Sequence, residues 1–189
     1  DIVTVNLLFV VSCLPIVTIG VAKISLYQTI FEVKRSRRIP VFKIYIRAFK
    51  QNLKLGFQLG LLELGIFLIS VVDLSLFWSQ TGVAFQLIKA ICLGILIFLT
   101  LVMLASYPIA ARYELTCKEV LQKGLLLVSF NFVWFFLMLA IILLIMMLLY
   151  LSGFTLVLGG SAFLLFGFGL LAFCQAGLME KLFAKYQAD

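Results

Sequence analysis

The stretch GLLLVSFNFVWFFLMLAIILLIMMLLYLSGFTLVLGGSAFLLFGFGLLAFCQAGLM, Gly124 to Met179, decides the fold because none of its 56 residues is charged. As one helix it would be about 84 Å long, since each residue adds about 1.5 Å, whereas the hydrocarbon core of a bilayer is about 30 Å thick. The run is therefore predicted to cross a membrane, turn and cross again. Ser152-Gly153 is the first choice for the turn, and Gly159-Gly160 is the second.

The rest of the chain has the same character. The runs from Ile2 to Ala22 and from Ala90 to Ala111 also lack charge, and about 20 apolar residues are enough for one crossing. Hydrophobic residues make up 65% of the 189, and charged residues make up 12%, about half the share in soluble domains. We therefore predict an all-α integral membrane protein with a single transmembrane domain over residues 1–189. Its five transmembrane helices are expected at about 5–27, 55–72, 83–105, 125–149 and 155–178.

Basic residues indicate the orientation of these spans. Lysine and arginine occur in the loop 31–54, in the loop from Arg112 to Lys123 and in the tail after Glu180, but not in the loop 73–82 or around Ser152. Cytoplasmic loops of membrane proteins carry the excess of lysine and arginine. The alternation predicts an N-terminus outside and a C-terminus in the cytoplasm.

The basic loop 31–54 contains a second pattern, in the stretch VFKIYIRAFKQNLK, residues 41–54. Its cations recur at helical spacings of four, three and four, with apolar side chains between them: Lys43, Arg47, Lys50 and Lys54. This pattern predicts an amphipathic helix in the cytoplasmic interface that runs into the second span. Its basic stripe has two candidate uses, namely attraction to anionic lipid, at about 1 kcal/mol per basic residue, or docking of another protein.

The first span contains a proline. In NLLFVVSCLPIVTIG, Asn6 to Gly20, Pro15 removes one backbone hydrogen bond and is expected to kink the helix near the middle of the bilayer. Ser12 and Thr18 are close enough to help satisfy the freed backbone groups. The kink has two interpretations: it serves helix packing, or it opens a broken helix beside a substrate path, as in transporters.

Glu63 is the costly residue of the second span, because an ionised side chain inside a bilayer needs a partner or a neutral form. Lys23 in the first span is the nearest cation in depth, so an intramembrane Lys23–Glu63 ion pair is predicted, and Asp73 and Lys89 are candidates for a similar pair near the outer face. A proton or cation relay through Glu63 is the alternative. Small residues on the same face predict a helix-packing seam at Gly56, Gly60 and Glu63, and a second one at Ala172 and Ala176.

Several function classes find no support in the residues. The chain has no histidine, no Walker A, HExxH or GxSxG motif, and no paired cysteines, so neither an enzyme nor a metal or other cofactor site is expected. The tract Lys-Arg-Ser-Arg-Arg at 34–38 is interpreted as an orientation signal beside a membrane helix, not as a nucleic-acid site. Membrane lipids are the expected partners of the basic loop.

Four stretches of the chain resemble stretches that follow one another in the same order in a known family. They are NLLFVVSCLPIVTIG with Leu26-Tyr27, Ile46 to Lys54, SYPIAARYELTCKEVLQKGL from Ser106 to Leu125, and LFAKYQ from Leu182 to Gln187. In these the chain resembles the YesL-type membrane proteins of Gram-positive bacteria over essentially its whole length. Lys23 departs from the family, whose members typically have a small or apolar residue there. The positions that carry the resemblance are Asn6, Pro15, Thr18, Gly20, Phe49, Asn52, Pro108, Arg112, Tyr113 and Tyr186.

The resemblance implies a partner class, since such proteins are typically encoded near carbohydrate ABC importers and glycan-degrading enzymes. It implies an accessory, non-catalytic subunit in the bacterial cytoplasmic membrane that packs against the permease helices of a carbohydrate or oligosaccharide ABC importer. One of the two predicted seams, at Gly56, Gly60 and Glu63 or at Ala172 and Ala176, would be the contact with the permease, and the cytoplasmic loops would face the ATPase. The EAA-type loop of the permeases is absent, so the chain is not expected to be the permease itself. The alternatives are a small autonomous transporter or channel that uses Glu63, and a membrane sensor that relays sugar availability.

Overall fold

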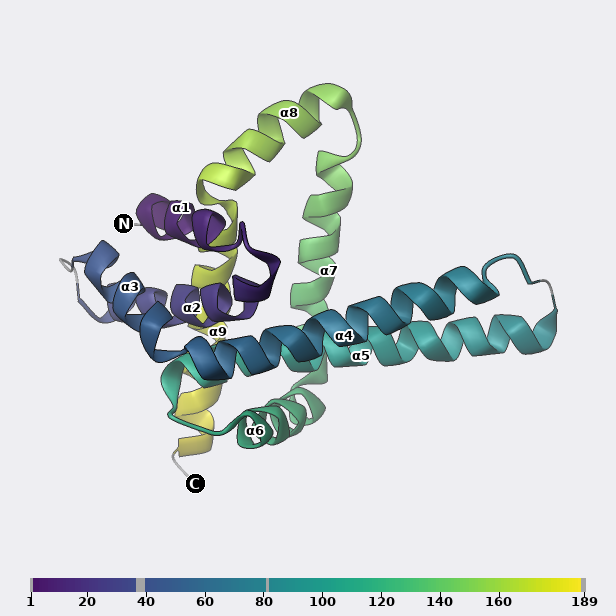
Figure 1. Cartoon of the computed structure of the whole chain (residues 1–189), viewed down its shortest axis with the longest axis horizontal. Coiled ribbons are helices and arrows are strands. Elements are labelled where there is room, and N and C mark those ends of the chain that lie inside the picture. Colours follow the sequence, from purple (N-terminus) through teal and green to yellow (C-terminus); the bar gives the residue numbers. More distant parts are fainter. Residues whose placement is uncertain (1, 37–39, 81, 188–189) are drawn as a thin grey trace.

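The computed structural model describes residues 2–36, 40–80 and 82–187, and these residues form helices joined by turns, without a strand (Figure 1). In chain order the elements are α1 (Ile2–Ser12), η1 (Ile16–Thr18), α2 (Ile19–Arg35), α3 (Val41–Gln51), α4 (Leu53–Phe77), α5 (Val83–Arg112), α6 (Cys117–Phe130), α7 (Phe132–Leu149), α8 (Gly153–Ala162), η2 (Phe163–Gly167) and α9 (Phe168–Gln187). η1 is a 3₁₀ turn, and η2 is a π-helical turn.

Within the described residues, five helical segments are long and apolar enough to cross a membrane. They are Ile16–Arg35, Leu53–Leu76, Val83–Arg112, Phe132–Leu149 and Leu156–Ala184. The chain is therefore an all-helical, multi-pass membrane protein. The predicted fold class and number of spans are confirmed, whereas several predicted boundaries are wrong.

The first span is not one kinked helix over residues 5–27. α1 ends at Ser12, and the chain resumes as η1 at Ile16 and as α2 at Ile19. The reason is that Pro15 has no N–H to donate and also disfavours a helical conformation at the residue before it. The hydroxyl of Thr18 donates to the carbonyls of Ser12, at 2.7 Å, and Pro15, at 2.8 Å, so it satisfies groups that the break exposes.

The break lets α1 fold back onto the rest of the protein. α1 has 11 residues, about 16 Å of helix, which is too short for a crossing. It contacts α2, α3, η2 and α9 (Figure 1). The spanning segment consequently moves toward the C-terminus, to Ile16–Arg35.

The fourth predicted span, 125–149, is also divided. Asn131 separates α6 from α7, and its side-chain amide donates to the carbonyl of Leu127 at 3.1 Å. Asparagine competes with helical backbone bonds in this way. α6 packs against α5 through Gly124, where an added Cβ would lie 2.6 Å from the Ser106 Oγ. The crossing segment is Phe132–Leu149, and the turn before the last span lies at residues 150–152, directly before Gly153, so that it overlaps the predicted break at Ser152-Gly153.

Residues 41–51 form the helix α3, as the amphipathic pattern predicts, but the helix does not continue into the second span. It ends at Gln51, and Asn52 separates it from α4. Lys54 therefore lies on α4, apart from the other cations of the predicted stripe. α3 packs on α2 and α1, and its Tyr45 is fully buried.

α2 is the centre of the fold and contacts α1, α3, α4, α5 and α9. In contrast, α4 and α5 form a long antiparallel hairpin that extends away from the other helices (Figure 1). No described side chain between residues 64 and 76 of α4 is buried, and in α5 the first buried residue is Leu101. Much of the hairpin thus presents apolar side chains outward.

Candidate functional site: an ion pair at a glycine crossing

The candidate site begins where α2 crosses α4. A Cβ added to Gly20 would lie 2.2 Å from the carbonyl oxygen of Gly56 and 2.7 Å from the nitrogen of Gly60. A Cβ added to Gly56 would lie 2.5 Å from the Cα of Val21. Only glycines allow the two backbones to approach so closely. The predicted seam at Gly56 and Gly60 is therefore filled by the α2 helix of the chain itself.

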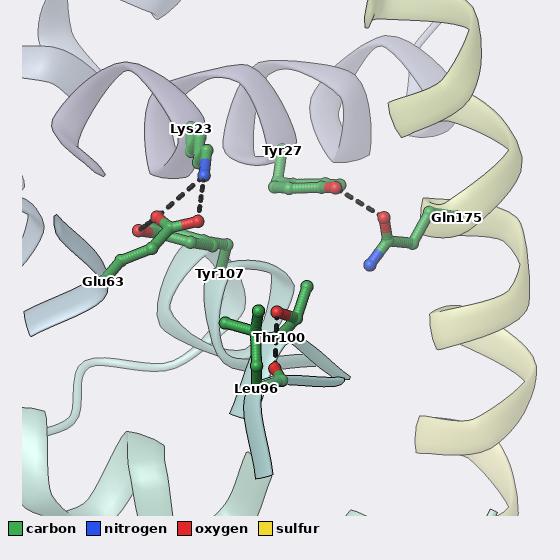
Figure 2. A network of polar contacts seen from close by, with 7 residues as sticks. All are labelled: Lys23, Tyr27, Glu63, Leu96, Thr100, Tyr107 and Gln175. Atoms are coloured by element: carbon green, nitrogen blue, oxygen red, sulfur yellow. Dashed lines mark hydrogen bonds and ion pairs between the residues drawn. The ribbon is translucent and has the colours of Figure 1, made fainter. Parts of the chain in front are cut away.

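The crossing brings two charged side chains together. Lys23 lies one helical turn after Gly20, and Glu63 lies one turn after Gly60. The Lys23 Nζ lies 2.6 Å from Oε1 and 2.7 Å from Oε2 of Glu63 (Figure 2). This is the ion pair predicted from the similar depth of the two residues in the membrane. The tight approach at the glycines explains how a pair 40 positions apart is held at this distance.

Tyr107 of α5 completes the cluster. Its hydroxyl donates to the Glu63 Oε2 at 2.5 Å, and the Lys23 Nζ lies 4.7 Å from the centroid of its ring. Glu63 thus accepts hydrogen bonds from two helices, while Lys23 has both a carboxylate and an aromatic face beside it. Charges inside a bilayer are tolerated when they are paired and hydrogen-bonded in this way. Tyr107 was missed by sequence reasoning, because nothing in its neighbourhood points to Glu63.

A second polar link ties α2 to the last span. Tyr27, one turn after Lys23, donates to the Oε1 of Gln175 at 2.6 Å (Figure 2). The Nε2 of Gln175 in turn donates to the carbonyl of Leu104 at 2.7 Å. On either side of Gln175, Ala172 and Ala176 are buried. Because α9 packs against α2, this second predicted seam also lies inside the chain.

A cavity of about 350 Å³ adjoins the ion pair. Its polar lining comes from Lys23, Glu63 and Thr100, and the rest is apolar. The Thr100 hydroxyl donates to the carbonyl of Leu96 at 2.8 Å (Figure 2). This space is thus mainly apolar, with one charged pair in its wall. No group of three metal-ligating side chains occurs among residues 2–36, 40–80 and 82–187.

Asn6 joins the first helix to the last span. Its Nδ2 donates to the carbonyl of Leu164 at 2.6 Å, and its Oδ1 accepts from the N–H of Gly169 at 2.7 Å. A π-helical turn such as η2 displaces the regular backbone hydrogen bonds, and the fully buried amide of Asn6 serves one carbonyl and one N–H there. Only one signal in the sequence pointed to this link, an amide in an otherwise apolar run.

The other positions of the family resemblance are spread over the protein. Asn52 donates to Gln28 at 2.8 Å, Phe49 stacks on Tyr45, and Pro108 is buried inside α5. The Arg112 guanidinium lies 4.9 Å from the centre of the Phe183 ring, which also meets Tyr113 edge to face at 5.5 Å. The side chain of Tyr186 lies outside the described side chains.

Two further lysines differ from expectation. Lys89 donates to the carbonyls of Trp78 and Gln80, both at 3.0 Å, and no ion pair joins Asp73 to another residue that the structure describes. An unpredicted pair joins α2 to α9 instead, with the Lys34 Nζ 2.6 Å from Glu180. The sequence did not predict this pair, because its two residues lie in the first and last spans, far apart along the chain.

Comparison with known proteins adds little chemistry. Residues 2–74 match a family model described as "Protein of unknown function, DUF624". The match covers the glycine crossing of α2 and α4, with both Lys23 and Glu63, but not Tyr107 or α9. No curated protein and no solved structure matches the chain. The N-terminal part is thus similar to a family whose description assigns no activity.

Proposed function

We propose that the chain is an accessory, non-catalytic subunit of a carbohydrate or oligosaccharide ABC importer, a multi-pass protein of the bacterial cytoplasmic membrane with its N-terminus outside. The partner class follows from the resemblance to YesL-type proteins in the stretches around Asn6 to Gly20 and Ser106 to Leu125. The observation that supports a role in assembly is the α4–α5 hairpin, which extends beyond the packed body (Figure 1).

The hairpin offers a surface for partner helices. Phe67, Leu68 and Ile69 on α4, and Leu87 and Ile91 on α5, are all exposed. Helices in a bilayer associate through close packing, because lipid tails are as apolar as leucine side chains. Permease helices would pack against these exposed side chains of the hairpin.

This assignment relocates the contact that the sequence predicted. The faces of Gly56, Gly60 and Glu63, and of Ala172 and Ala176, are occupied by the chain's own helices. The hairpin beyond Glu63 takes their place in the proposal. For the permease loops or the ATPase, a groove of about 940 Å³ between the start of α4 and the end of α5 is the proposed contact, with Lys54, Arg112 and Glu114 in its wall.

Two glycines make the proposal testable without disturbing the fold. A Cβ added to Gly65 of α4 or Gly94 of α5 meets no atom within 4 Å. Gly65→Leu and Gly94→Leu should therefore leave the chain folded but hinder a partner helix. Gly160→Leu on α8 is the matched control, since its Cβ also meets open space.

The experiment is purification of each tagged variant from its own host in mild detergent, followed by mass spectrometry. The parent and Gly160→Leu should bring down permease and ATPase chains in fixed ratio, and the two hairpin variants should lose them. Recovery of the parent free of any transporter component would overturn the proposal.

An autonomous transporter is the second candidate, favoured by the cavity beside Lys23 and Glu63. Against it, Glu63 is held by Lys23 and Tyr107, and a coupling residue must exchange its partners during transport. Solute flux into proteoliposomes distinguishes the two. A protein-dependent flux that Glu63→Gln abolishes would favour the transporter, and the absence of flux in the parent would remove it.

A further inference from the structure

The helix α3 presents two chemically different faces. Its inner face, with Val41, Tyr45 and Ala48, is buried. Its outer face carries the three exposed cations Lys43, Arg47 and Lys50. Two large apolar side chains share that outer face, Phe42 with 61% and Ile46 with 36% of its surface exposed. The apolar residues of α3 thus do not all serve the core.

The three cations have no partner in the part of the chain that the structure describes. The ion pairs there are Lys23–Glu63 and Lys34–Glu180. No carboxylate lines the space between the three cations, and no described hydrogen bond engages their side chains. Their charge is available to a ligand.

These side chains border a shallow, open groove of about 370 Å³ along one face of α3, lined by Phe42, Lys43, Ile46, Arg47, Lys50 and Gln51. A ligand that matches it carries negative charge and an apolar part side by side. A soluble anion would leave Phe42 and Ile46 in water, and an apolar molecule would leave the cations unpaired. An anionic amphiphile satisfies both groups.

The position of α3 indicates which amphiphile is present. One residue, Asn52, separates α3 from α4, whose spanning segment begins at Leu53. The groove therefore lies next to the point where the chain enters the membrane, at the level of lipid headgroups. We propose that the groove binds an anionic phospholipid, with its phosphate at Lys43, Arg47 and Lys50 and its acyl chains against Phe42 and Ile46. This proposal is independent of the importer.

Native mass spectrometry of the detergent-solubilised full chain tests the site. The probes are phosphatidylglycerol and phosphatidylcholine with identical acyl chains. The groove variant is Lys43→Gln/Arg47→Gln/Lys50→Gln. Its matched control, Lys118→Gln/Lys123→Gln/Lys181→Gln, removes three exposed lysines that do not line the groove.

The parent should retain phosphatidylglycerol in preference to phosphatidylcholine. Each groove cation is expected to contribute roughly fivefold, so the groove variant should lose preference by well over tenfold, and the control by much less. Added salt should weaken the preference, because screening shortens the reach of the charges. Equal retention of both lipids by the parent, or equal losses in the two triple variants, would overturn the proposal.

Two further arms separate the lipid from other occupants. Phe42→Ser/Ile46→Ser should weaken retention of phosphatidylglycerol, and glycerol phosphate, which lacks acyl chains, should not displace it. Full displacement by glycerol phosphate would make this a site for free phosphate and overturn the lipid assignment. Unchanged lipid retention by the groove variant, together with loss of co-purifying chains, would make α3 a protein-docking surface instead.

Discussion

Gly20 of α2 and Gly56 of α4 lie in direct backbone contact, so that a Cβ on Gly20 would stand 2.2 Å from the Gly56 carbonyl oxygen. The contact explains the position of the ion pair, because Lys23 and Glu63 follow the crossing by about one turn on each helix. Close backbone approach and charge pairing are thus parts of one arrangement, and the two can be perturbed separately.

Gly20→Ala should destabilise the protein although alanine is the better helix former. Overpacking against backbone costs about 1–3 kcal/mol, whereas helix propensity favours alanine by only about 1 kcal/mol. At Gly65, where the Cβ meets open space, the same substitution should be neutral or stabilising. Thermal unfolding in detergent measures both variants, and the same sign of change in the two would contradict the crossing.

The Lys23–Glu63 pair should show strong coupling. Lys23→Met leaves a carboxylate and Glu63→Leu leaves an ammonium group without its charged partner, and each is expected to cost about 2.5–3.5 kcal/mol. The double variant should be more stable than the sum of the two losses predicts, since it leaves no charge unpaired. The unfolding free energies of the parent, the two single variants and the double variant give the coupling energy. Additive losses would show that pairing contributes nothing to stability.

Asn6→Ala should loosen the last span at a distance of about 160 residues in sequence. The carbonyl of Leu164 and the N–H of Gly169 lose their partner, at a cost of about 1–3 kcal/mol. Hydrogen exchange should speed up at residues 164–169. Asn52→Ala, which breaks a bond to Gln28, serves as the control and should leave that segment protected.

The start of α6 should respond to acid. Thr116 and Glu119 form a capping box, and the backbone N–H of Thr116 holds the pKa of the Glu119 carboxyl below its usual value. A lowered pKa means that the cap stabilises α6 fully above about pH 4.3, the ordinary value for glutamate, and is lost as pH falls through the folded-state value. The Thr116 amide should therefore lose protection from hydrogen exchange as the pH falls through the lowered pKa of Glu119, below the ordinary range of glutamate. In Glu119→Gln the side chain still accepts from the Thr116 N–H but carries no titratable charge. The protection of the Thr116 amide in this variant should therefore not change over that range.

Much of the fold follows from the sequence alone, because the length of uncharged runs reflects the thickness of a bilayer. The helix α3 follows from its basic spacing, and the partner of Glu63 follows from depth in the membrane. The breaks at Pro15 and Asn131 do not, since a proline or asparagine in an apolar run is compatible with a kink, a break or a straight helix. What decides between them is the docking of distant segments.

The site was harder to predict for a related reason. A small-residue face shows that a helix approaches, but not whether that helix belongs to the same chain. Gly56 and Gly60 indicated a seam, and only the structure identifies Gly20 as its other side. The bonds from Tyr107 to Glu63 and from Asn6 to η2 join segments with no shared pattern. Such contacts are set by tertiary packing.

The amide of Asn6 has a consequence for biosynthesis. Its two partners, Leu164 and Gly169, leave the ribosome long after α1, because synthesis proceeds from the N-terminus. While the intervening spans enter the membrane, the side-chain amide of Asn6 lacks its final hydrogen-bond partners. The contacts of α1 with η2 and α9 are consequently among the last to form, whereas its contacts with α2 and α3 can form as soon as those helices have been made.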